Sequence, residues 1–261
     1  MKFIIITGNE LRHRFFALTV SKKLNVAHVY LEKKANVHEK FECTPEQKQI
    51  IDKHFALREK SEQQYFGGYN DISSLPHSFI DTGKSNDPDI TEHIKGLNAD
   101  AVLLFGSSLI KEPLLSLFDN KTINLHLGLS PYYRGSGTNF WPLFYNEPEC
   151  VGATIHLATA QVDAGAILLQ VRPAYNENDT IHDLGNKTIQ ASAEVLPDAV
   201  MRFFSGQLQP QVQPEGIGKL CKRKDLTAES IVKVYDNFEN GMMADLLNNI
   251  EKRLASFPIV T

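Results

Sequence analysis

Cysteine is scarce in this sequence. Only three cysteines occur in 261 residues, at Cys43, Cys150 and Cys221, and none lies in a C-x-x-C pair. An odd number of distant cysteines argues against a disulfide framework and against a thiolate zinc site. The nine histidines show no paired ligand spacing such as H-E-x-x-H. We therefore expect chemistry that needs no metal.

Long hydrophobic runs and a strong charge of one sign are also missing. The four apolar residues after Lys2 are too few for the core of a signal peptide, and no run approaches the roughly 18 residues of a membrane span. A net charge of −4 does not indicate a nucleic-acid surface. These absences predict a cytoplasmic protein whose partners are neither membranes nor nucleic acids.

Two common nucleotide-binding motifs are absent as well. No G-x-G-x-x-G follows the first apolar run, which argues against a dinucleotide cofactor. Gly83-Lys84-Ser85 resembles the end of a phosphate-binding loop, but Ser78 stands where that loop needs its first glycine. Binding of a nucleoside triphosphate at this place is therefore not expected.

What the sequence does contain is an alternation of strand and helix patterns. Apolar, often β-branched runs predict strands, and capped or amphipathic stretches predict helices. The strands are expected at 2–7, 26–31, 77–81, 101–105, 122–126, 151–157 and 166–171, and the helices at 11–24, 45–66, 87–97, 138–146 and 180–204. This order predicts an α/β, Rossmann-like fold: a mostly parallel sheet with helices on both faces. We expect a catalytic domain over residues 1–205 and a short C-terminal extension over residues 206–261.

The segment from Asn124 to Gly135 carries the first chemical signal. It leaves a buried strand and enters a loop that contains glycine and proline. Side chains two apart in a strand share a face, so Asn124 and His126 would lie together, where ligands bind in open α/β sheets. Such a pair suits catalysis. An asparagine and a histidine that only bond to nearby backbone remain an equal alternative from these residues alone.

A second signal is Asp163, which lies between two apolar runs in the sequence Val162-Asp163-Ala164-Gly165. A carboxylate in this loop could orient an imidazole across the site. Taken alone, an aspartate before glycine is more simply a turn-capping residue.

Together, these segments resemble the folate-dependent formyltransferase family. The resemblance covers about residues 1–205: Asn-x-His, a Pro-containing loop with Arg134-Gly135, a Gly-x-Thr-x-His strand, and Val-Asp-x-Gly-x-Ile. It implies transfer of a formyl group from N10-formyltetrahydrofolate to an amine, with Asn124, His126 and Asp163 as the catalytic residues. Asp163 would favour a protonated His126. Leu127, Gly128 and Ser130 depart from the family wording, which affects the shape of the loop.

The resemblance also implies which residues hold the two substrates. For the folate it implies one group of residues: Phe105, Gly106, Ser107, Ser108, Leu109, Gln161 and Val162. For the acceptor we expect a second group: Gly8, Asn9, Arg12, His13, Tyr132, Tyr133 and Arg134. A solvated helix face is an equal reading of Arg12 and His13. His156 is expected to pack the site or to be hydrogen-bonded in its strand, and Phe140, Trp141 and Phe144 to belong to the core.

The acceptor is predicted to be a nucleotide-linked amino sugar, such as a dTDP-amino-deoxysugar. Methionyl-tRNA enzymes of the family carry a larger C-terminal domain, and the net charge of −4 also argues against tRNA. Another small amine, methionyl-tRNA, hydrolysis of the formyl donor, and a non-enzymatic folate- or nucleotide-binding protein remain alternatives. The sequence leaves a homodimer open.

Overall fold

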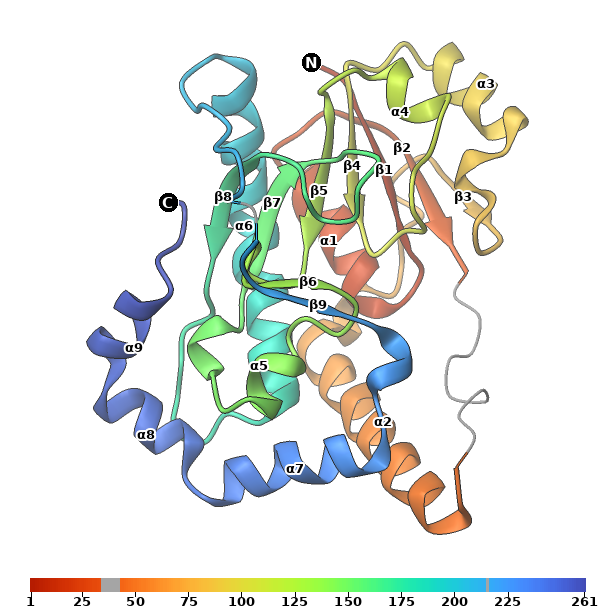
Figure 1. The fold of residues 1–261 in the computed structure, drawn as a ribbon. Helices are drawn as coiled ribbons and strands as arrows, with labels where there is room; N and C mark the ends of the chain where they lie inside the picture. Colours follow the sequence, from red (N-terminus) through yellow and green to blue (C-terminus); the bar gives the residue numbers. More distant parts are fainter. Residues whose placement is uncertain (34–42, 215) are drawn as a thin grey trace.

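A seven-stranded sheet forms the centre of the computed structural model, which describes residues 1–33, 43–214 and 216–261. The strand order is β3-β2-β1-β4-β5-β7-β8 (Figure 1). The strands are β1 (Phe3–Gly8), β2 (Val26–Glu32), β3 (His77–Ile80), β4 (Ala101–Phe105), β5 (Thr122–His126), β7 (Ala153–Leu157) and β8 (Ile167–Val171). Pairing is parallel from β3 to β5, whereas β7 and β8 are antiparallel. The prediction of a mostly parallel sheet is confirmed.

Helices cover both faces of this sheet, as predicted. They are α1 (Leu11–Ser21), α2 (Pro45–Phe66), α3 (Pro88–Gly96), α4 (Leu114–Leu117), α5 (Trp141–Phe144), α6 (Ile181–Phe204), α7 (Ala228–Glu239), α8 (Met242–Asn248) and α9 (Ile250–Ser256). One core lies between the sheet and α1 and α6, and a second lies between the other face and α3 and α4. Alternate residues of β1, β2 and β4 enter the two cores, because successive side chains point to opposite faces.

Local sequence signals fix the ends of the two longest helices. Thr44 and Gln47 form a reciprocal capping box before α2, and Thr180 and Asp183 do the same before α6. One expected helix is much shorter than predicted: only Trp141–Phe144 of residues 138–146 is helical. The preceding turn, with Gly137 in the left-handed region, runs along the site instead.

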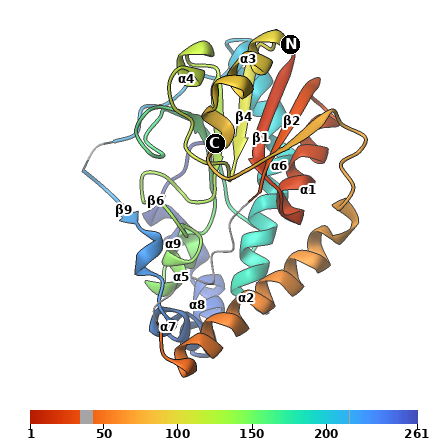
Figure 2. The ribbon, with the colours of Figure 1, turned by 90° about the vertical axis from the view of Figure 1, so that its right-hand side faces the viewer.

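The C-terminal extension packs against the domain. Its short strand β9 (Lys219–Cys221) pairs in parallel with β6 (Tyr133–Gly135), which follows the Asn-x-His segment. Helices α7 to α9 run from the bottom to the left-hand side in Figure 1, and Figure 2 shows α7 beside the N-terminal end of α2. Near the C-terminus, Val260 and Gln170 share two hydrogen bonds, which tie the chain end to β8. Among the described helices, none is long and apolar enough to cross a membrane.

Strand order places the site. The chain moves outward from β1 to β2 and β3, and then returns to add β4 and β5 on the other side of β1. The loops after β1 and β4 therefore leave in opposite directions, which opens a crevice beyond the carboxyl ends of the strands. Strand β5 ends next to this crevice at His126.

Candidate functional site

A cavity of about 1390 Å³ lies beyond the carboxyl ends of β1, β4 and β5. Its wall includes residues 9–14, 104–110, 124–127 and 135–140, with parts of the loop 158–163, of α2 and of the start of α6. Binding pockets for one small ligand commonly measure about 300–1,000 Å³. This cavity therefore has room for two ligands side by side.

The three side chains expected to be catalytic meet in this cavity. Nδ1 of His126 lies 3.4 Å from Oδ2 of Asp163, and both side chains are at least 90% buried. Asn124 stands two residues before His126 on β5 and lines the same cavity. The predicted proximity of an amide, an imidazole and a carboxylate is therefore present.

The backbone explains how each side chain reaches this place. Ile123 and Leu125 of β5 enter the core under α1 and α6, so Asn124 and His126 face the opposite side. Asp163 is in the left-handed region with φ +50°, where aspartate is one of the few tolerated residues. Its carboxylate accepts a hydrogen bond of 3.0 Å from the backbone N–H of Gly135.

His156 is the fourth side chain of the cluster, and it is hydrogen-bonded within its strand, which is one of the two expected roles. It stands directly opposite Asn124 in the antiparallel pairing of β5 and β7. Its Nδ1 lies 2.8 Å from the carbonyl oxygen of Leu157, so this nitrogen carries the proton. Its Nε2 then accepts a hydrogen bond of 3.1 Å from Nδ2 of Asn124, and lies 3.7 Å from Oδ1 of Asp163. His156 thus orients the Asn124 amide.

Burial decides the charge state of the pair. Burial lowers the pKa of His126 below its ordinary value. The Asp163 carboxylate raises this pKa and His156 lowers it further, and the effect of burial is the largest of the three. Asp163 was expected to favour a protonated His126, and it does act in that direction, but burial outweighs it and the pKa stays below its ordinary value. Burial also raises the pKa of Asp163, but the polar contacts of its carboxylate, which include the Gly135 N–H, outweigh burial and hold that pKa low. The pair at neutral pH is a neutral imidazole beside a carboxylate.

Every residue expected to bind the folate lines the cavity: Phe105, Gly106, Ser107, Ser108, Leu109, Gln161 and Val162. Leu109 and Val162 are each about half exposed, so both can offer apolar surface to a ligand. Ser108 has a different contact, because its N–H and hydroxyl both donate to the buried carboxylate of Glu32. Its side chain therefore shapes the loop after β4.

The residues expected to bind the acceptor divide into two groups. Asn9, Arg12 and His13 line the cavity, whereas the described residues that line it do not include Gly8. His13 is buried and its Nδ1 lies 2.6 Å from Oε2 of Glu10. Its ring fills the space between Gly8 and Gly106, where a side chain on either glycine would collide with it. His13 is thus a packing residue of the site.

The second group, Tyr132, Tyr133 and Arg134, is not part of the described cavity wall. Tyr133 is completely buried, with its hydroxyl donating to Glu147, and the hydroxyl of Tyr132 donates to the carbonyl of Pro258. The segment instead forms β6 and pairs with the extension. The cavity is lined instead by the next residues, 135–140.

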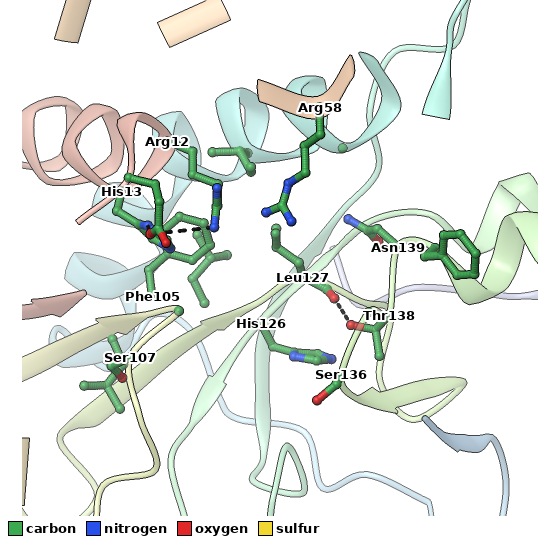
Figure 3. A pocket seen from close by; sticks show the side chains of 18 of the residues that line it. Arg12, His13, Arg58, Phe105, Ser107, His126, Leu127, Ser136, Thr138 and Asn139 are labelled. Carbon is green, nitrogen blue, oxygen red and sulfur yellow. Dashed lines mark hydrogen bonds and ion pairs between the residues drawn. The ribbon is translucent and has the colours of Figure 1, made fainter. Parts of the chain in front are cut away.

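Arg58 is a cavity residue that the sequence analysis missed. It lies on α2, far in sequence from the expected site residues on either side, His13 and Phe105, and no local motif marks it. Figure 3 shows the guanidinium groups of Arg12 and Arg58 pointing into the cavity from the helices that face His126. Both arginines contact the same oxygen of Glu62, at 2.5 Å and 3.1 Å. One carboxylate oxygen thus serves two cations, which leaves donors of Arg58 for a bound anion.

Buried histidines around the cavity make stability depend on pH. Burial lowers the pKa of His13 and of His182 to about 4, from an ordinary value of 6.5. Between these values the unfolded chain binds more protons, so the free energy of unfolding must fall as the pH falls. Urea unfolding at about pH 5 instead of about pH 7.5 should show a loss of roughly 1–2 kcal/mol for each histidine. His182→Asn should remove its share of that loss; an equal loss in this variant would contradict the assignment.

No group of three or more His, Cys, Asp or Glu side chains in the described part of the chain is arranged to hold a metal ion. The polar groups of the site instead converge on one point at the end of β5. This arrangement offers a hydrogen-bond donor in Asn124 and a proton acceptor in His126 with its carboxylate partner.

Comparison with known proteins agrees with this picture. The family model described as "Formyl transferase" matches residues 14–200. Methionyl-tRNA formyltransferase of Caldanaerobacter subterraneus subsp. tengcongensis is 30% identical over 131 residues, which are 50% of this chain and 42% of that protein. The protein of the same name from Citrifermentans bemidjiense is 31% identical over 143 residues, 53% of this chain and 44% of that one. The chain thus spans less than half the length of these curated relatives.

Solved structures share the fold. Glycinamide ribonucleotide transformylase 1 from Symbiobacterium toebii gives a TM-score of 0.56 at 19% identity, with 82% of this chain and 94% of that chain covered. A sugar N-formyltransferase from Shewanella sp FDAARGOS_354 gives 0.54 at 19% identity, with 86% and 78% covered. A 4-N formyltransferase from Francisella tularensis gives 0.54 at 17% identity, with 90% and 86% covered.

Proposed function

The chain belongs to the formyl transferase family, and we propose that it transfers a formyl group from N10-formyltetrahydrofolate to a primary amine. The observation that carries this proposal is the cluster of Asn124, His126 and Asp163 at one end of a large cavity. The folate would supply an already activated formyl group, so the protein must bind, orient and move one proton.

Asn124 would stabilise the negative charge that develops on the formyl oxygen. Its Nδ2 donates one hydrogen bond to His156, and this bond fixes the direction of the amide. The second N–H of the amide is then available to the oxygen. A preorganised donor of this kind contributes about 3–4 kcal/mol to stabilisation of the transition state.

His126 and Asp163 would move the proton. The attacking amine loses one proton, and the folate nitrogen that leaves gains one. A neutral His126 accepts the first proton, and the nearby carboxylate stabilises the imidazolium that results. His126 then returns the proton to the leaving nitrogen. Nε2 of His126 is 3.4 Å from the Tyr133 carbonyl, a long contact that it can exchange for a substrate while Nδ1 stays beside Asp163.

The acceptor would be an amino sugar carried on a nucleotide. Its phosphates would lie on the side of Arg58 and Arg12, and its amine would reach the end of β5. Support comes from the guanidinium groups opposite His126 and from a cavity with room for two ligands. A net charge of −4 is poorly suited to a tRNA acceptor.

A direct assay tests this assignment. The protein would be incubated with 10-formyltetrahydrofolate, alone and with a panel of amines: dTDP- and UDP-linked amino sugars, glycinamide ribonucleotide and methionyl-tRNA. We expect tetrahydrofolate to be released only when a nucleotide-linked amino sugar is present. Release without any amine would indicate hydrolysis, and activity confined to methionyl-tRNA or glycinamide ribonucleotide would overturn the acceptor class.

Arg58 provides a prediction about the acceptor. Arg58→Gln removes a charged hydrogen-bond donor, and such bonds contribute about 1.5–3 kcal/mol. The KM for the nucleotide-linked amine should therefore rise roughly ten- to hundredfold, while the KM for the folate changes little. Arg202→Gln, which removes an exposed arginine at the far end of α6, is the matched control. An unchanged acceptor KM in Arg58→Gln would contradict the role of Arg58.

A further inference from the structure

The loop that carries Asp163 is held from outside the domain that the sequence analysis called catalytic. We propose that Gln213, in the C-terminal extension, is a positioning residue that keeps the Asp163 carboxylate aimed at His126. This proposal rests on the proposed function, since it assumes that Asp163 takes part in formyl transfer. Gln213 lies beyond the residues that the family model matches, which end at 200.

The contacts of Gln213 go to the backbone of the Asp163 turn. Its Nε2 donates to the carbonyl oxygen of Asp163 at 2.9 Å and to that of Gly165 at 2.8 Å. Because both partners can only accept, the atom that faces them must be the amide nitrogen. The side chain is 8% exposed. Its other atom, Oε1, is buried and has no hydrogen-bond partner among the described residues.

The Asp163 turn needs such support. Asp163 has φ +50°, a conformation that costs a non-glycine residue about 1–3 kcal/mol unless its surroundings hold it. Two residues later, Gly165 packs so closely against the Leu157 carbonyl that a side chain would collide with it. Val162, on the other side, is half exposed. Gln213 thus bridges the strained residue and the tightly packed glycine with one amide.

The extension is itself anchored on both sides of Gln213. Before it, Gln211 and Ile167 exchange two backbone hydrogen bonds of 2.7 and 2.8 Å at the start of β8. After it, the N–H of Ser136 donates to the carbonyl of Cys221 as β9 pairs with β6. Strand β6 ends at Gly135, whose N–H donates to the Asp163 carboxylate. The extension therefore contacts the Asp163 turn directly through Gln213. Through β9 it also holds Gly135, whose N–H donates to the Asp163 carboxylate.

The test replaces Gln213 with a side chain of similar size that cannot donate. Gln213→Met should lower kcat about ten- to hundredfold with both KM values changed by less than about twofold, because misplacement by roughly 1 Å affects the chemical step. Looser contacts between Asp163 and its neighbours should raise its pKa, so the acid limb of the kcat–pH profile should move to higher pH. A purely structural role would not move this limb.

Controls keep the test decisive. Gln209→Met removes an exposed glutamine that bonds the Gly206 carbonyl in the same extension, and it should leave kcat unchanged. Circular dichroism and cooperative urea unfolding check that each variant folds. Gln213→Glu, which keeps the side-chain volume but replaces the amide donor, should give the same loss and serves if the methionine variant does not fold.

A double-mutant cycle separates this proposal from the function on which it depends. If Gln213 acts through Asp163, Gln213→Met should have almost no further effect in the Asp163→Asn background. Wild-type kcat in Gln213→Met and Gln213→Glu, or an equal loss in both backgrounds, would overturn the positioning role. Failure of the proposed function would look different: the unaltered protein would transfer no formyl group, or Asp163→Asn would be fully active.

Discussion

Asp163→Asn should lower kcat about 1,000-fold, because general acid–base catalysis contributes roughly 10²–10⁴. The substitution removes the negative charge that stabilises the imidazolium of His126 when it takes the proton of the amine. It changes little else. Asparagine tolerates the left-handed backbone at position 163, and its amide oxygen can still accept from the Gly135 N–H.

The measurement is steady-state formyl transfer with both substrates saturating, beside a urea unfolding curve for each protein. Asp198→Asn is the matched control, because it removes an exposed aspartate from the ion pair at the far end of α6. It should keep full activity. Near-normal kcat in Asp163→Asn would show that the carboxylate is a structural turn residue, which is the simpler reading of an aspartate before glycine.

His126→Ala should abolish measurable transfer, with a loss of kcat of about 10³–10⁴. Loss of the ring removes the group that accepts the proton from the amine and then donates it to the leaving nitrogen. The space left beside Asp163 lies in the cavity wall, so added imidazole should enter it and restore part of the activity. The measurement is kcat with and without imidazole over a range of pH.

His77→Ala is the control for this variant. His77 lies in β3 at the edge of the sheet, where its ring contacts only the Leu75 carbonyl and the Phe79 ring among the contacts described. Its loss should leave transfer unchanged. A folded His126→Ala protein with normal turnover would remove this imidazole from the mechanism.

Much of the fold was predictable because local chemistry determines it. The apolar runs of β1 and β4 are fully buried strands, and Thr44 and Thr180 form the expected caps of α2 and α6. The proximity of Asn124 and His126 followed from the two-residue period of a strand. Local signals were less useful at residues 138–146. The helical pattern there competes with the left-handed backbone of Gly137, just before it, and with contacts to the cavity wall.

The residues that support the cluster could not be read from the sequence. His156 reaches Asn124 only through the antiparallel register of β5 and β7, which no local pattern specifies. Arg58 lies on a polar face of α2. In the sequence this face looks the same as a solvent-exposed helix face, and only the position of α2 over the cavity distinguishes them. Gln213 lies in a Gln/Pro-rich segment that carries no motif. Each position depends on packing between elements far apart in the chain.

The charge of His126 also could not be predicted from the sequence alone. The nearby carboxylate argued for a protonated ring, and the direction of that single effect is right. Burial works in the opposite sense and is larger, but burial is a property of the folded chain. A pKa below its ordinary value favours a neutral His126, which suits the proposed role of proton acceptor.

The destination of the formyl carbon tests the mechanism most directly. Tetrahydrofolate that carries a ¹³C-labelled formyl group would be mixed with the protein and a nucleotide-linked amino sugar, and the products followed by NMR. We predict that the label appears as a formamide on the sugar nitrogen, at a rate that depends on the amine and on His126. Label that appears only as formate, at the same rate with or without the amine, would contradict formyl transfer by this cluster.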